Sequence, residues 1–250
     1  MSAEKYFETM QGILTRIAST QAEKIRQAGE LMAAALADAK RVYLFGSGHS
    51  VLPVMDMFPR YGSFVGFFPL YDPRLMWFNV IGPGGARELL WLERQPGYVP
   101  VFLSSYPLEA GDVMIVFSHG GVNAAPLEAA AEARKRGLRV ISVSSHANRS
   151  GGSCPPPGGK SLPELADVAL DNCVPPEDAL VDVGWKEKVA AGSTVAAVFI
   201  AMSLVAETAA RLAARGLHPP AFVAPHVPGV SPDHNQQVFE AFRRECFRRA

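Results

Sequence analysis

The sequence predicts an α/β fold: a doubly wound, five-stranded parallel sheet with helices on both faces. One observation is that short apolar runs alternate with stretches of helical periodicity along the 250 residues. Another is that, within the strand expected at 112–117, residues 113–117 are continuously apolar, as expected for a strand covered on both faces. A third is that two of these runs end in glycine-bearing turns that lead into helices, which is typical of strand–turn–helix units.

The chain opens with two predicted helices within residues 4–38, where apolar side chains recur at helical spacing. This apolar stripe has to be buried either on the chain's own sheet or on a second subunit. A first strand is expected at 41–45, followed by a turn and a helix that continues to about residue 61. A second buried strand is expected at 64–70.

The middle of the chain continues this alternation. The glycine-rich residues 82–85 predict a loop, and residues 86–94 predict a short helix. The third strand at 112–117 is followed by a helix at 124–136, which Gly137 closes. A fourth strand is expected at 140–143.

The last third is less regular. Residues 146–160 are rich in Gly, Pro and Ser, so we expect a surface excursion or lid rather than a domain linker. A fifth strand at 167–170 and a weaker strand candidate at 179–183 precede a long helix at 188–215. A proline-rich connection then leads to a last helix at 233–249, with Asp233 as its cap. The 250 residues are therefore interpreted as a single domain.

The composition limits the classes of partner and the cellular location that the sequence predicts. Lys and Arg number 24 and Asp and Glu number 24, with no basic run in the body of the chain, which argues against nucleic acid. Residues 189–206 carry no charge but are rich in small residues, so a buried helix is favoured over a membrane span. Three scattered cysteines and the absence of a signal peptide predict a cytoplasmic protein. No cofactor or metal site is expected, since ligand-spaced His/Cys clusters are absent.

Two polar turns are the strongest functional signal. Gly46-Ser47-Gly48-His49-Ser50 follows the first strand, and Ser118-His119-Gly120-Gly121-Val122-Asn123 follows the third. Ligands of open α/β sheets bind at the carboxyl ends of strands, so both turns could converge on one anion. Neither turn has the lysine of a P-loop, and the first lacks the third glycine of a dinucleotide fingerprint.

These residues resemble the SIS (sugar isomerase) domain family, which has a flavodoxin-like sheet, over nearly the whole chain. Both turns match the family's turns, and Lys186–Val189 with Ser193-Thr194 matches its last helix. Within the family, the sequence is most similar to an uncharacterised bacterial group with a single SIS domain. That similarity extends to residues 160–172, 178–181 and 233–235.

The resemblance implies a phosphorylated sugar, amino sugar or keto/aldo phosphate as ligand. The residues that it places around the phosphate are Gly46, Ser47, Gly48, His49, Ser50, Ser118, His119, Gly120, Gly121, Asn123, Ser193 and Thr194. The chain departs from the family at Gly120, where a serine is usual. This loss of one hydroxyl should weaken phosphate binding, because only the backbone amide remains.

Aldose–ketose isomerisation requires a base that moves a proton between C2 and C1. Glu93 is the first candidate, because the resembled enzymes place a glutamate in this region; the alternative is a solvated Glu93 paired with Arg87 or Arg94. Glu187 is the second candidate, and its alternative role is to complement the dipole of the long helix.

Histidine could assist ring opening. His49 is expected to touch the ligand, and His234 to reach the site of a neighbouring subunit; the alternative for His234 is helix capping alone.

Three functions remain open: a sugar-phosphate isomerase, a lyase that cleaves ethers of amino-sugar phosphates, and a non-catalytic sugar-phosphate sensor. The sensor is disfavoured because the helices before Arg41 leave no room for the usual DNA-binding module. We also expect a homodimer or homotetramer, since the first helix and the uncharged helix carry more apolar surface than one sheet covers.

Overall fold

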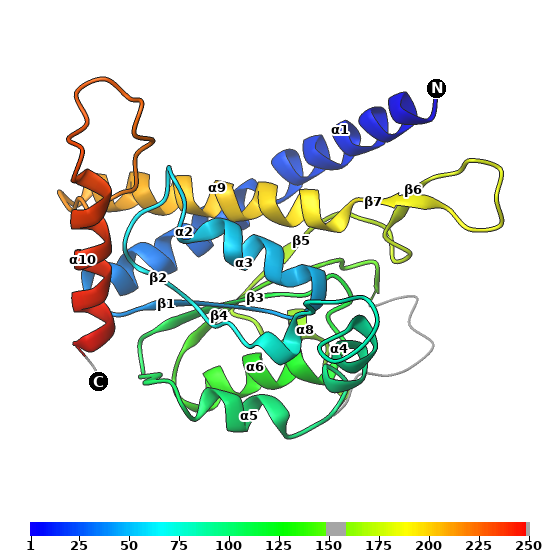
Figure 1. Cartoon of the computed structure of the whole chain (residues 1–250), viewed down its shortest axis with the longest axis horizontal. Helices are drawn as coiled ribbons and strands as arrows, with labels where there is room; N and C mark the ends of the chain where they lie inside the picture. The colour runs from blue at the N-terminus through cyan, green and yellow to red at the C-terminus, as the bar shows by residue number, and fades with distance from the viewer. Residues whose placement is uncertain (149–158, 249–250) are drawn as a thin grey trace.

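The computed structural model describes residues 1–148 and 159–248, and its centre is a parallel sheet with the strand order β2-β1-β3-β4-β5 (Figure 1). This order confirms the predicted doubly wound sheet. Its strands are β1 (Val42–Gly46), β2 (Phe67–Pro69), β3 (Val113–Phe117), β4 (Arg139–Ser144) and β5 (Val168–Asp171). All neighbouring pairs are parallel, and Gly46 lies opposite Phe117, so the first and third strands end side by side.

Alternating side chains of β1 pack into two separate hydrophobic cores, one on each face of the sheet. Val42 and Leu44 belong to the core beneath one layer of helices, whereas Tyr43 and Phe45 belong to the core on the opposite face. The first layer comprises α1 (Ser2–Thr20), α2 (Ala22–Ala37), α3 (Val51–Met57) and α9 (Ser193–Ala214). The second comprises α4 (Ala86–Leu92), α5 (Tyr98–Leu103), α6 (Ala124–Lys135) and α8 (Leu162–Leu165).

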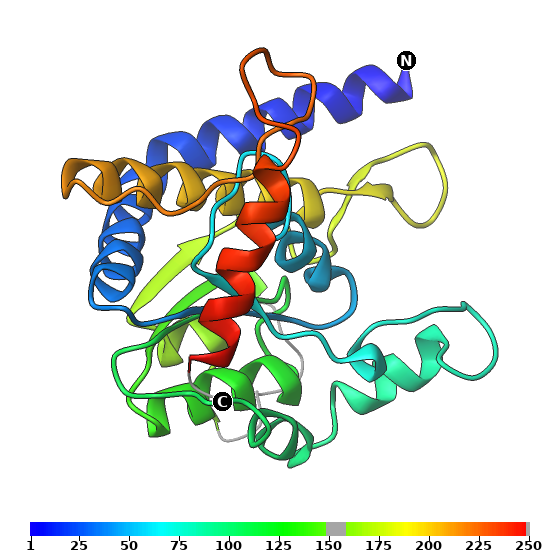
Figure 2. The same ribbon diagram turned by 60° about the vertical axis from the view of Figure 1, so that its left-hand side comes forward.

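The last helix, α10 (His234–Phe247), stands across the edge of the sheet beside β2, as the turned view in Figure 2 shows. Two short 3-10 turns, η1 (Gly48–Ser50) and η2 (Pro73–Leu75), follow β1 and β2. The proposed excursion at 146–160 falls largely on residues 149–158, which lie outside the described residues, as does the end of the predicted helix at 233–249.

Two predicted elements are shorter than expected for local reasons. The helix after the first turn ends at Met57 rather than near residue 61, because Phe58 precedes Pro59 and adopts an extended backbone. The predicted strand at 64–70 joins the sheet only over Phe67–Pro69. Phe64 instead bridges to Ala221 in the connection before α10, so this segment is divided between two partners.

The predicted helix at 188–215 is also wrong at its start. Val189–Ala191 is a short strand, β7, which pairs in antiparallel fashion with β6 (Ala179–Val181), and the helix begins at Ser193. The Asp178 carboxylate accepts hydrogen bonds from the amides of Gly192 and Ser193 at 3.0 and 2.7 Å. This side-chain cap defines the first turn of α9. The weaker strand candidate therefore forms a separate hairpin rather than a sheet strand.

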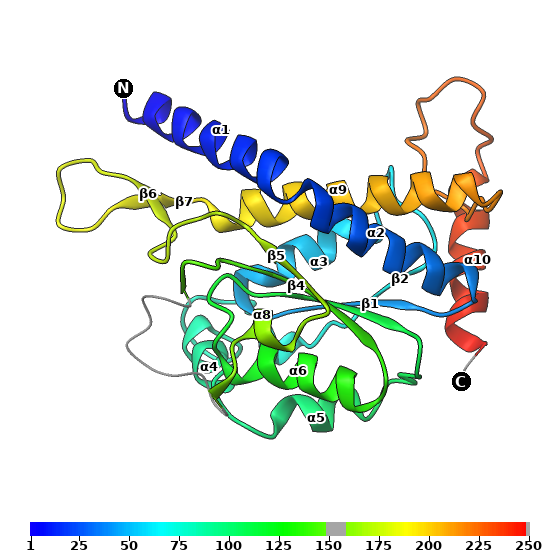
Figure 3. The same cartoon turned by 180° about the vertical axis from the view of Figure 1, so that it is seen from behind.

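The two N-terminal helices are buried in different ways. Helix α2 packs its buried Met32 against the sheet and α9. Helix α1 buries only Met10, Ile13 and Ile17, and it extends past the sheet beside the β6–β7 hairpin (Figure 3). Phe7 on this extension is 66% exposed. The chain's own sheet therefore covers α2 but not the outer half of α1.

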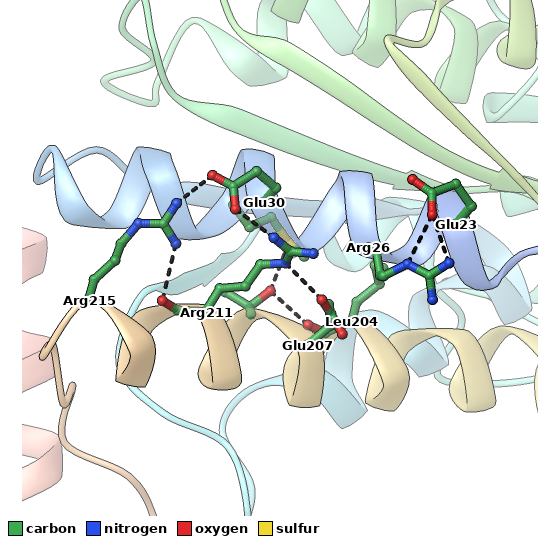
Figure 4. A network of polar contacts seen from close by, with 9 residues as sticks. Glu23, Arg26, Glu30, Leu204, Glu207, Arg211 and Arg215 are labelled. Atoms are coloured by element: carbon green, nitrogen blue, oxygen red, sulfur yellow. Dashed lines mark hydrogen bonds and ion pairs between the residues drawn. The ribbon is translucent and has the colours of Figure 1, made fainter.

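Ion pairs join α2 to α9 on the solvent side (Figure 4). Arg211 donates to Glu30 and to Glu207, each at 2.7 Å, and Arg215 donates to the second oxygen of Glu30. Arg211 holds the pKa of Glu30 below its ordinary value.

The helix α9 is long and apolar enough to cross a membrane by length and composition alone. Here it packs between α2 and α3, as predicted for a core helix.

Candidate active site

The first turn approaches its neighbours so closely that glycine is required. A Cβ on Gly46 would lie 2.1 Å from the carbonyl oxygen of Ser50, and Gly48 has φ of +58°. The amide of Ser50 donates to the carbonyl of Ser47 at 3.1 Å, which closes the turn. The tight turn delivers Ser47, His49 and Ser50 to the carboxyl edge of the sheet.

The second turn holds its shape through Ser118. The hydroxyl oxygen of Ser118 accepts a hydrogen bond from the amide of Gly121 at 3.1 Å, which leaves the hydroxyl proton available for a ligand. Gly121 has φ of +64°, whereas Gly120 has an ordinary φ and room for a Cβ. The backbone would therefore accept serine at position 120, so the departure from the family pattern is not imposed by the turn.

Glu93 joins the two turns. It directly follows α4 and is only 8% exposed. Its carboxylate accepts one hydrogen bond from the Ser47 hydroxyl at 3.0 Å and another from the Asn123 side-chain amide at 2.9 Å. The backbone carbonyl of Glu93 accepts a hydrogen bond of 2.9 Å from the amide of Ala125, which lies at the start of α6. One residue therefore connects α4, the turn after β1 and the turn after β3.

Burial raises the pKa of Glu93 above its ordinary value of 4.5, while the Ser47 hydrogen bond and the nearby Arg94 charge act in the opposite direction. The alternative of a solvated, arginine-paired Glu93 is wrong, since the carboxyl is buried and bonded to neutral groups. Ser47 and Asn123, which the resemblance implied as phosphate ligands, both donate hydrogen bonds to this carboxylate.

A narrow cleft lies beside this cluster, between the two turns and the start of α9. Six predicted residues line it: His49, Ser50, Ser118, His119, Ser193 and Thr194. Its volume is about 10 Å³, which is room for about one water molecule, so a sugar phosphate requires its walls to separate. The structure thus brings together the residues predicted from three distant segments.

Asn172 and Asp178 belong to this site but were not predicted as site residues. Asn172 follows β5 and lines the cleft, where its side-chain amide lies 3.2 Å from Nδ1 of His119. The Oδ1 atom of Asn172 accepts from the amide of Val174, so its NH₂ group faces the histidine. Nδ1 of His119 is then the acceptor, and Nε2 carries the proton toward the carbonyl of Pro176 at 3.4 Å. The signal that could have identified Asn172 is its place at the end of a strand.

Asp178 occupies an anion position at the N-terminus of α9. Besides its hydrogen bonds from the amides of Gly192 and Ser193, its carboxylate accepts a hydrogen bond from the Ser193 hydroxyl at 2.9 Å. The N-terminus of a helix attracts negative charge, and the carboxylate satisfies it here. Ser193 is therefore already engaged, whereas Thr194 faces the cleft.

Two predicted catalytic residues, Glu187 and His234, lie apart from the cleft, whereas His49 lines it. Glu187 is exposed in the loop of the β6–β7 hairpin, near Lys186, rather than at the start of α9. His234 is the first residue of α10, on the opposite side of the molecule from α4, with its Nε2 2.8 Å from the carbonyl of Ala221 (Figure 1). His49 is exposed and stacks edge-on against Trp77, with ring centroids 4.6 Å apart.

Comparison with known proteins identifies similar sequences over almost the full length. A profile of the SIS domain matches residues 5–145. A UPF0309 protein of Brucella anthropi is 36% identical over 242 residues, covering 96% of both chains. A UPF0309 protein of Caldanaerobacter subterraneus subsp. tengcongensis is 31% identical over 243 residues, also covering 96% of both.

Solved structures share the fold. A phosphoheptose isomerase from Francisella tularensis has a TM-score of 0.54 at 16% identity, covering 82% of this chain and 95% of that one. A phosphoheptose isomerase from Neisseria gonorrhoeae has a TM-score of 0.54 at 15% identity, covering 82% of this chain and 95% of that one.

The buried carboxylate makes the stability of the protein depend on pH. Burial raises the native pKa of Glu93 above its unfolded value, so the native state binds more protons between the two values. The free energy of unfolding contributed by Glu93 is then present below about pH 4.5 and is lost as pH rises toward the native pKa. Because glutamine does not titrate, Glu93→Gln should become more stable relative to wild type as pH rises from 4 to 8, measured by urea unfolding.

Glu30→Gln provides an opposite control. Arg211 lowers the native pKa of Glu30, so the stability contributed by this carboxylate is present above its unfolded pKa. Glu30→Gln should accordingly lose stability relative to wild type as pH rises. A Glu93→Gln curve that followed the Glu30→Gln trend would contradict the burial argument.

Proposed function

Since the chain belongs to the SIS domain family, we propose that it binds a phosphorylated sugar at the carboxyl edge of its sheet and isomerises aldose and ketose forms. Membership confirms the resemblance deduced from the two turns. The observation that supports catalysis best is the Glu93 carboxylate, buried between both turns and bonded to Ser47 and Asn123.

The phosphate is proposed to bind in the cleft between the two turns and the start of α9. Ser50, Ser118 and Thr194, which line the cleft, contribute hydroxyl groups there. The backbone amide of Gly120, in the same turn as Ser118, is proposed as a further donor. Neutral donors of this kind bind a phosphate monoester without a lysine cluster. The Asp178 carboxylate marks a further anion position, and its displacement would free the first amides of α9 for the phosphate.

Glu93 is proposed as the base. It takes the proton from C2 of an aldose phosphate to form an enediolate; a proton moves from O2 to O1, and Glu93 returns its own proton to C1 to give the ketose. Its raised pKa suits this task, since a base works best with a pKa nearer the operating pH. The two neutral donors orient the carboxylate and keep it from forming a competing ion pair.

Ring opening requires a second acid–base group, and two histidines remain proposals for it. His49 is close to the cleft in the same chain. His234 begins α10 on the far side, so it could act only on the site of a second copy.

Exposed apolar side chains support a dimer or tetramer of this chain. Leu52 and Met55 on α3, and Val195 and Phe199 on α9, are more than one-third exposed on two helices that pack together. Burying such side chains against another copy would remove them from water.

The Ser118 hydroxyl should contribute directly to phosphate affinity. A hydrogen bond to a charged group is worth about 1.5–3 kcal/mol, so Ser118→Ala should weaken binding of a sugar phosphate by roughly 10- to 100-fold. The ligand is first chosen by a thermal-shift screen, because a molecule that binds only the native state raises the melting temperature. Calorimetry then compares Ser118→Ala with Ser104→Ala, an exposed serine at the end of α5. Equal affinity of the two variants would mean that Ser118 does not touch the phosphate.

Glu93→Gln keeps the shape of the side chain and removes the base. Exchange of the substrate's C2 proton with solvent deuterium, followed by NMR, should fall by ~10²–10⁴-fold while affinity is retained. Glu88→Gln, on the exposed side of the same helix, should exchange at the wild-type rate. Unchanged exchange in Glu93→Gln would show that Glu93 is not the base, and Glu187, which lies in the exposed β6–β7 loop, would then have to act on the site of another copy. Exchange followed by loss of an ether substituent would indicate a lyase, and a ligand that binds wild type without exchange would favour a sensor.

A further inference from the structure

A second, larger cavity lies at the edge of the sheet under α10. Its volume is about 810 Å³, within the range of small-molecule sites. Phe68 of β2, Phe239 and Phe242 of α10, and Ser105 and Tyr106 after α5 contribute to its wall. None of its lining residues lines the cleft between the turns, so the two sites are separate.

Arg41 is the only charged side chain among the described residues of this wall. It is 3% exposed, and its guanidinium lies 4.6 Å from the centre of the Phe68 ring. Arginine stays protonated in proteins, so a full positive charge is buried beside an aromatic surface.

The groups hydrogen-bonded to the Arg41 guanidinium are uncharged, while the buried Asp112 carboxylate accepts a hydrogen bond from the Arg41 backbone amide at 2.9 Å. The Nη2 atom of Arg41 donates to the carbonyl oxygens of Glu245 and Cys246 at the end of α10, and its Nη1 lies 3.4 Å from the Tyr43 hydroxyl. Its Nε is buried without a hydrogen-bond partner. Within residues 1–148 and 159–248, Arg41 forms no ion pair. A buried cation and an unused N–H group call for an anion.

The rest of the wall is uncharged and largely aromatic. The ring centroids of Phe242 and Phe68 lie 5.3 Å apart, and those of Phe242 and Phe58 lie 4.8 Å apart. Burial raises the pKa of Cys246 and of Tyr106, so both remain neutral at physiological pH. The cavity therefore suits a ligand that is largely apolar and carries one negative group to pair with Arg41.

We propose that this cavity binds a small aromatic carboxylate, whose ring packs among the phenylalanines and whose carboxylate pairs with Arg41. The ion pair would supply the missing negative charge, and the ring would fill apolar volume. The proposal does not depend on the phosphosugar site, because the two cavities share no residue.

Binding is tested by calorimetry on the full chain with 2-naphthylacetate, indole-3-butyrate and 4-phenylbutyrate, and with the amide of each. At least one carboxylate should bind saturably with one site per chain, and its amide at least about 10-fold more weakly, since the charged hydrogen bond is lost. Arg41→Met should abolish the preference for the carboxylate.

Because Arg41 also holds the end of α10, a second variant tests the cavity without altering that contact. Ser105→Trp places a bulky ring at the exposed rim and should block the carboxylate while leaving sugar-phosphate binding unchanged. Ser118→Ala, in the other cleft, should bind the carboxylate as wild type does.

Three results would overturn the proposal: no binding of any carboxylate at millimolar concentration, equal affinity for acid and amide, or unchanged binding in Ser105→Trp. A change of oligomeric mass in Ser105→Trp by light scattering, with carboxylate binding retained, would instead identify this face as an interface between copies.

Discussion

A buried carboxylate between two glycine-bearing turns is the interaction on which the candidate site depends. Removing a carboxylate from water is costly, so Glu93 requires donors that are fixed in place. Ser47 and Asn123 supply them from turns that are more than 70 residues apart in the chain. The same contacts fix the position of α4 relative to both turns. The site is therefore assembled by tertiary structure, because no single segment contains it.

The strand order explains why these turns meet. In a sheet with the order β2-β1-β3-β4-β5, the chain winds outward in opposite directions from β1 and β3. The turns after these strands diverge to opposite faces and leave space between them at the carboxyl edge. The N-terminus of α9 enters the same space from the side, with Asp178 holding its first amides. The two turns and the N-terminus of α9 thus surround one narrow cleft. The Asp178 carboxylate already occupies the position nearest α9.

Much of the fold and part of the site could be predicted, because they depend on local patterns. The five strands follow from apolar runs, whereas Glu93 is expected because the resembled enzymes place a glutamate in this region of the chain, after a glycine-rich loop. The start of α9 could not be predicted, since Asp178 caps it from fifteen residues away. The same long-range pairing forms the β6–β7 hairpin and carries Glu187 away from the site. The roles of Ser47 and Asn123 depend on where α4 docks, and the Arg41 cavity depends on how α10 packs beside β2.

The central claim is that the cleft is a phosphosugar site with Glu93 facing the reacting carbons. A crystal structure of the chain with the sugar phosphate that raises its melting temperature most would test it directly. The account predicts the phosphate against Ser118, Gly120 and Thr194, and a Glu93 oxygen within roughly 3–3.5 Å of C1 or C2. A sugar phosphate bound elsewhere, or one whose C1 and C2 face away from Glu93, would contradict it.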